Sequence, residues 1–197
     1  MRRSYFLIAA LVVVVGLLAA CGGGGGAPVP MQTFEGSTFT IEYPKDWKQN
    51  SMDFLGITMA LFSARQLSME DLQGMDFETM AAEDPIAIVM LVPAEMASDM
   101  GFEDIDQALG EVVPGQDENV EIIKQEDTSL GDAKGKLVIA KGDIPDVGSV
   151  GLHLAIAKRD DNSVIVLMGV SPGKSQDQNL KIFEYMHKSF KFKKAEK

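Results

Sequence analysis

Residue types that commonly build sites are scarce in this sequence of 197 residues, which has one cysteine, two histidines and one tryptophan. A single cysteine cannot form an internal disulfide, so the fold has no disulfide framework. The two histidines lie in no H-E-x-x-H motif and there are no paired cysteines, which argues against a zinc site. Cys21 is therefore better explained by its place after the apolar N-terminal run than by a redox or metal role.

Basic residues are also scarce over a long stretch. Between Arg65 and Lys124 there is no Lys or Arg, whereas that stretch holds fifteen Asp and Glu. The whole chain has 18 basic and 29 acidic residues, a formal charge of −11. This balance argues against binding nucleic acid, and against docking of the protein itself on anionic lipid. We interpret the acidic stretch as a solvated surface; the alternative is a surface for cations or a basic partner.

The first twenty residues have the pattern of a signal peptide. Arg2 and Arg3 precede an apolar run over residues 5–20, which is shorter than the roughly 20 residues that a spanning helix needs. The run ends in Leu18-Ala19-Ala20-Cys21, which looks like a bacterial lipobox. We expect residues 1–20 to be removed and Cys21 to receive a diacylglycerol and an N-acyl chain. The alternative is an uncleaved membrane anchor.

A tether follows the cysteine. Residues 22–26 are all glycine and residues 27–30 read Ala-Pro-Val-Pro, a composition typical of flexible linkers. We predict a lipidated cysteine with its tether at residues 21–30 and a single domain at residues 31–197. The mature chain would have 16 basic and 29 acidic residues, a formal charge of −13. These features predict a lipoprotein anchored in a membrane and facing the periplasm or the cell exterior, with no cofactor besides the covalent lipid.

Hydrophobic patterning predicts an α+β domain with a mostly antiparallel β-sheet sandwiched by helices. Strands are expected over residues 38–43, 56–64 and 86–92, and helices over residues 68–84 and 102–112. Four further strands at residues 120–125, 133–141, 149–158 and 163–170 precede a last helix over residues 175–189. That helix places Leu180, Phe183 and Met186 on one face.

Two landmarks resemble the PsbP-like superfamily, over about residues 31–193. The first strand contains Phe39, Ile41, Tyr43 and Pro44 and is followed by Trp47, and the last helix runs into Ser189 and Phe190. The resemblance implies an antiparallel sheet between helices and a non-enzymatic binding or assembly module. The matching residues are core-type residues, so no metal or partner site is implied at them.

One catalytic-looking motif is present. Residues 169–173 fit G-x-S-x-G around Ser171, and Asp177 and His187 follow in the order of a hydrolase triad. In such an elbow the residue after the serine donates its N–H to the oxyanion hole, but here that residue is Pro172, which has no N–H. We therefore predict a plain strand-to-helix turn.

Other polar candidates have simpler explanations. His153 stands in an alternating strand, so we expect a half-exposed sheet residue there. Asp104, Asp106 and residues 116–119 offer oxygen ligands for calcium, but their spacing does not match an EF-hand loop. We interpret these acids as a solvated face.

Methionine is common, with twelve in the chain and eight between Met52 and Met100. Unbranched Met fills irregular cores and adaptable apolar grooves, and its thioether is a soft ligand for Cu(I). We favour core filling, then a binding groove lined by Met59, Met80, Met90 and Met96, and copper last.

Three functions follow from the sequence. The first is a lipid-anchored, non-enzymatic module that binds another envelope protein. The second is a carrier or sensor for a small apolar molecule or a metal ion. The third is a hydrolase that uses Ser171.

Overall fold

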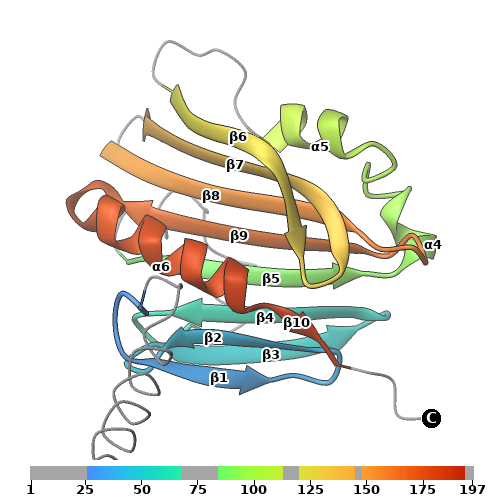
Figure 1. Ribbon diagram of the computed structural model, residues 1–197, viewed down its shortest axis with the longest axis horizontal. Helices are drawn as coiled ribbons and strands as arrows, with labels where there is room; N and C mark the ends of the chain where they lie inside the picture. The colour runs from blue at the N-terminus through green and yellow to red at the C-terminus, as the bar shows by residue number, and fades with distance from the viewer. Residues whose placement is uncertain (1–25, 68–83, 113–119, 145–147, 194–197) are drawn as a thin grey trace, which may run out of the picture.

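The computed structural model describes residues 26–67, 84–112, 120–144 and 148–193 (Figure 1). A three-stranded sheet has the order β1-β2-β10, and a seven-stranded sheet has the order β3-β4-β5-β9-β8-β7-β6. All strand pairs are antiparallel. The strands are β1 (Met31–Glu35), β2 (Phe39–Pro44), β3 (Lys48–Phe54), β4 (Ile57–Ser63), β5 (Ile86–Val92), β6 (Val120–Leu130), β7 (Ala133–Ile144), β8 (Gly148–Lys158), β9 (Val164–Pro172) and β10 (Lys191–Phe192).

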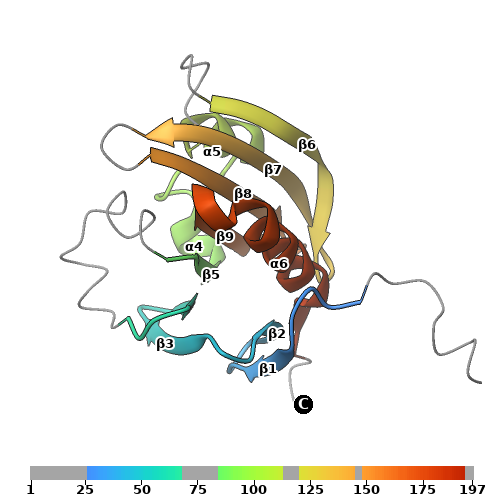
Figure 2. The same cartoon turned by 90° about the vertical axis from the view of Figure 1, so that its left-hand side faces the viewer.

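Helices lie on both faces of the large sheet, which confirms the predicted architecture. The long helix α6 (Gln176–Ser189) follows a short 3-10 turn η1 (Gly173–Ser175) and covers one face together with the small sheet (Figure 2). The helices α4 (Ala94–Ala97) and α5 (Ile105–Val112) cover the other face. No helix among the described residues is long and apolar enough to cross a bilayer.

The core beneath α6 is aromatic. Phe39, Phe62 and Phe183 are fully buried, and the ring of Trp47 packs edge-on against that of Phe183 at a centroid distance of 6.1 Å. Phe190 stacks on Phe39 at 5.2 Å. The residues of both sequence landmarks therefore meet in one core, which joins the start of the domain to its end.

Glycines let α6 lie close to the large sheet. A Cβ added at Gly169 of β9 would stand 2.4 Å from Cγ of Phe183, and one at Gly151 of β8 would stand 2.6 Å from Cγ of Gln176. Real Cβ atoms do not approach other carbons this closely, so a larger residue at Gly169 would displace the ring of Phe183, and one at Gly151 would displace the side chain of Gln176. The two glycines, one in β8 and one in β9, thus leave room for side chains of α6 against the sheet.

The predicted elements match the structure with a few differences. The expected helix over residues 102–112 begins at Ile105, because Asp104 caps it by accepting hydrogen bonds from the backbone N–H of Asp106 (2.8 Å) and of Gln107 (3.3 Å). The sequence did not predict β1, β3, β10 or α4. The helix expected over residues 68–84 falls almost wholly outside the described residues.

Candidate functional site

The residues of the hydrolase motif lie apart. Ser171 is fully buried in β9, where its hydroxyl donates to the carbonyl of Pro172 (3.2 Å) and accepts from Nδ2 of Asn179 (2.8 Å). Asp177 is exposed and bonds Nζ of Lys141 at 2.7 Å. His187 follows Asp177 by ten residues on α6, about 15 Å along the helix axis. The motif therefore lies at the end of β9, where the strand turns into α6 as predicted. The amide of Asn179 holds the buried serine.

His153 corrects an expectation, because it is fully buried rather than half exposed. Its strand, β8, lies near the middle of the large sheet, so α6 covers the face that we expected to meet solvent. Nε2 of His153 lies 3.2 Å from Nδ1 of His187, and the two rings are nearly perpendicular. The only two histidines of the chain are thus neighbours beneath α6.

The hydrogen-bond partners fix the tautomers of this pair. Nε2 of His187 lies 3.0 Å from the carbonyl oxygen of Ser129, which can only accept, and 3.1 Å from the hydroxyl of Thr128, which can also accept, so this nitrogen carries the proton. Nδ1 of His187 is then an acceptor, and Nε2 of His153 donates to it. Nδ1 of His153 is left as a buried acceptor with no partner among the described residues.

Burial keeps both rings neutral. Burial is the main cause that lowers the pKa of His153 from 6.5 to about 3, with smaller contributions from charge on His187 and Lys124. Burial also lowers the pKa of His187, against a smaller opposing effect of its bond to Ser129. The pair therefore links α6 to β6 and β8 as a structural polar contact that is closed to solvent.

The acidic candidates have structural roles where they are described. Asp104 caps α5, and Asp106 lies 3.6 Å from Nζ of Lys136. Within the ranges that the structure covers, no three His, Cys, Asp or Glu side chains gather closely enough to hold a metal ion. Residues 116–119 lie outside those ranges.

Two of the four candidate methionines are brought together. Met59 of β4 and Met90 of β5 stand directly opposite each other, and both are half-buried. Met96 of α4 and Met90 each pack against the core cluster beneath α4 and α5. Met80 and the predicted lipidation residue Cys21 lie outside the described residues. A groove lined by all four methionines therefore stays a prediction.

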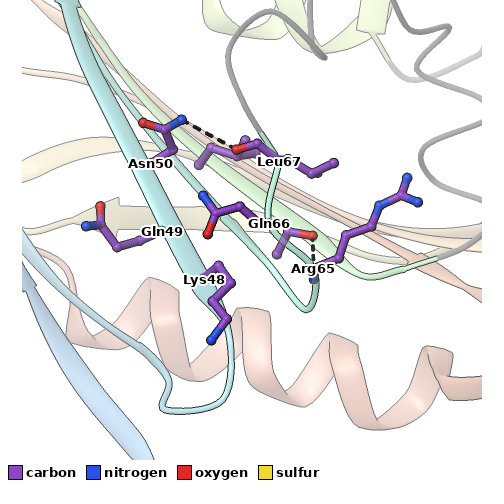
Figure 3. Close-up of a pocket in the computed structure, with 8 residues that line it drawn as sticks. Lys48, Gln49, Asn50, Arg65, Gln66 and Leu67 are labelled. Carbon is purple, nitrogen blue, oxygen red and sulfur yellow. Dashed lines mark hydrogen bonds between the residues drawn. The ribbon is translucent and has the colours of Figure 1, made fainter.

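Figure 3 shows a shallow depression between β3 and the segment after β4. The amide of Asn50 closes it by donating to the carbonyl of Leu67 at 3.4 Å. The depression has no room for a water molecule, so it offers no ligand site.

A larger groove of about 540 Å³ lies between the start of α5 and strands β6, β7 and β8. Lys134 and Lys158 stand opposite each other across β7 and β8 in its wall. Lys136 bonds Asp127 at 2.8 Å on the same wall. Small-molecule pockets are enclosed and mostly apolar, whereas this groove is open and lined by charges of both signs. Its chemistry favours contact with another macromolecule's polar surface.

Comparisons with known proteins concern the fold alone. No protein-family model and no curated protein matches the sequence. PsbP (CyanoP) from Synechocystis sp. PCC 6803 is 15% identical, with a TM-score of 0.46 over 87% of this chain and 98% of that one. The likeness to this PsbP protein is one of fold.

Two other similar structures come from a bacterium and from yeast. LpqN of Mycobacterium tuberculosis, described as involved in cell envelope biogenesis, is 10% identical with a TM-score of 0.47, over 84% of this chain and 91% of that one. The Ran-binding protein Mog1p of Saccharomyces cerevisiae is 11% identical with a TM-score of 0.44, over 82% and 95%.

Sequence reasoning missed the most exposed apolar side chains of the described residues, Phe54 and Leu55. They lie at the tip of the β3–β4 hairpin. Strand β3 reads KQNSMDF, which has neither β-branched residues nor regular alternation. The Leu-Gly that follows is also not a usual hairpin turn sequence. The available signal was two large apolar residues directly before a glycine.

Proposed function

We propose that this protein is a lipid-anchored binding or assembly module of the bacterial envelope, which acts outside the cytoplasm by recognising another envelope protein. One observation carries the proposal: among the described residues, the candidate serine and both histidines are hydrogen-bonded in the interior. Ser171 is held by Asn179, and His153 by His187. Two features of the described surface, an open groove with charges of both signs and an apolar hairpin tip, suit contact with a macromolecule.

The proposed anchor gives the domain a short reach. The described part of the tether is tied to the small sheet, because the backbone N–H of Lys45 donates to the carbonyl of Pro30 at 2.9 Å. A glycine-rich linker of ten residues has a root-mean-square end-to-end distance of about 17 Å. This is an upper value for residues 21–30, because Pro30 is held by the domain. A lipid on Cys21 would thus hold the domain close to a membrane, where its partner would be a membrane-bound or peripheral envelope protein.

The anchor is tested by mass spectrometry of the mature N-terminus. We expect the first residue to be Cys21 with acyl chains attached, and the protein to sediment with membranes. A Cys21→Ser variant should lose the acyl mass and leave the membrane fraction. An intact segment 1–20 with an unmodified Cys21 would contradict the anchor.

The binding role is tested with a lipid-free chain that starts at Cys21 and is made without the signal peptide. Its single thiol takes one fluorophore, and the labelled protein is titrated onto envelope membranes from cells that lack the gene. We expect saturable binding that unlabelled protein competes away and that protease treatment of the membranes abolishes. Binding that does not saturate would count against a specific partner.

A further inference from the structure

The β3–β4 hairpin ends in two large apolar residues that the protein does not bury. Phe54 is 59% exposed and Leu55 is 71% exposed, the highest values among the large hydrophobic side chains of the described residues. Neither packs in a core cluster. Their side chains therefore add little to the stability of the fold.

The backbone at the tip makes the choice of leucine more unusual. Phe54 pairs with Ile57, which leaves Leu55 and Gly56 as a two-residue loop with φ values of 51° and 84°. Both values lie in the left-handed region, as in a type I′ turn, where Asn-Gly is preferred and leucine is strained. The other described non-glycine residue with positive φ is Asn162, a residue type that tolerates this conformation. Leu55 thus neither favours the conformation of the turn nor packs in the core.

The tip is held in place and points away from the start of the domain. A Cβ at Gly56 would stand 3.3 Å from Cγ of Pro93, so the loop rests on the residue that precedes α4. The first strand begins at Met31, which pairs with Pro44 at the end of β2. Strand β3 begins shortly after Pro44, at Lys48, and so starts at the same end of the domain. From Lys48 to Phe54, β3 then runs about 20 Å toward the opposite end (Figure 1).

We propose that Phe54 and Leu55 form a docking tip that inserts into an apolar pocket on the envelope-protein partner, an inference that rests on the proposed function. Asp53 is the one charged residue among residues 49–64, so the rim of that pocket is neutral or basic. The position of the tip disfavours insertion into the anchoring membrane, because the tip lies at the far end from the tether. The net negative charge of the chain also opposes an anionic lipid surface.

The test uses the labelled chain and envelope membranes of the binding assay above. The tip variant combines Phe54→Ser with Leu55→Asn, because Asn preserves the left-handed turn. The matched control combines Ile122→Thr with Ile123→Thr, which removes a second exposed apolar pair from the edge strand β6. We expect the tip variant to bind at least tenfold more weakly and the control to bind as the unaltered chain does. Both variants should keep the far-ultraviolet circular dichroism of the unaltered chain.

Four other results would overturn the docking tip, and they can be distinguished from one another. Equal, saturable binding by the folded tip variant would refute the tip and leave the proposed function intact. Absence of saturable binding by the unaltered chain would overturn both. Tip-dependent binding to protein-free vesicles of phosphatidylethanolamine and phosphatidylglycerol would replace the protein partner by lipid. A tip-dependent dimer in sedimentation equilibrium would replace the partner by a second copy of the chain.

Discussion

Acid should destabilise this protein at pH values where most carboxylates are still ionised, because of the buried pair His153 and His187. Both have a lowered pKa in the folded state, so the unfolded chain takes up protons first as the pH falls below about 6.5. Above pH 6.5 both rings are neutral in the folded and in the unfolded chain, so they do not change the free energy of unfolding. Below pH 6.5 this free energy falls progressively. The loss continues until the folded-state pKa is reached, about 3 for His153.

The size of this loss in the free energy of unfolding follows from the one proton that each histidine ring takes up on unfolding. Each pH unit between the two pKa values costs about 1.4 kcal/mol per histidine. Between pH 6.5 and pH 5.0, His153 alone should therefore lower the free energy of unfolding by about 2 kcal/mol. His187 adds to the loss in the same direction, because its pKa is also lowered.

Urea unfolding followed by tryptophan fluorescence measures this loss. Trp47 is the single tryptophan and is buried, so its emission reports the core directly. In a His153→Gln variant the amide can still donate to Nδ1 of His187 but cannot take up a proton. We expect the stability of this variant to fall less steeply between pH 6.5 and 5.0, by about one proton.

A second variant separates the charge effect from a general loss of stability. Asn179→Ala removes the buried bond to Ser171 and no titrating group, so it should cost about 1–2 kcal/mol at every pH in this range. Equal pH slopes for the unaltered chain and His153→Gln would refute the reasoning. So would a nuclear magnetic resonance titration of His153 with an ordinary midpoint near 6.5.

Three further outcomes follow from the packing and the turns. Gly169→Ala should cost about 1–3 kcal/mol of unfolding free energy in urea, since its methyl group would collide with the ring of Phe183; a variant as stable as the unaltered chain would contradict the close packing of α6 on the sheet. Leu55→Gly should raise stability by about 0.5 kcal/mol, because it relieves the left-handed strain but adds backbone entropy. Lys141→Ala should leave the melting temperature unchanged, because its ion pair with Asp177 is largely exposed; a drop of several degrees would show that the pair matters.

Local patterns were enough to predict most of the sheet. Strands β6 to β9 and the helix α6 follow from apolar alternation, turn residues and helical spacing, which are properties of a few neighbouring residues. Strand β3 lacks that alternation because it is an edge strand, exposed on most of its length. Its existence depends on pairing with β4 and not on its own side chains.

The candidate sites were less predictable, because they depend on long-range packing. His153 and His187 are 34 residues apart, and their contact exists only once α6 lies on β8. Alternation along β8 correctly placed His153 on one face of the sheet but could not say that a helix covers that face. The G-x-S-x-G motif shows the opposite case, since local sequence matched a catalytic pattern that the fold does not assemble.

The central claim, that the folded domain binds an envelope protein at the membrane, is tested most directly by crosslinking in living cells. The full lipoprotein is compared with a chain in which residues 1–30 are kept and residues 31–197 are replaced by an unrelated folded domain. We predict that mass spectrometry identifies one recurrent envelope protein with the full chain and loses it with the replacement. Recovery of the same proteins with both chains would contradict a binding role for the domain.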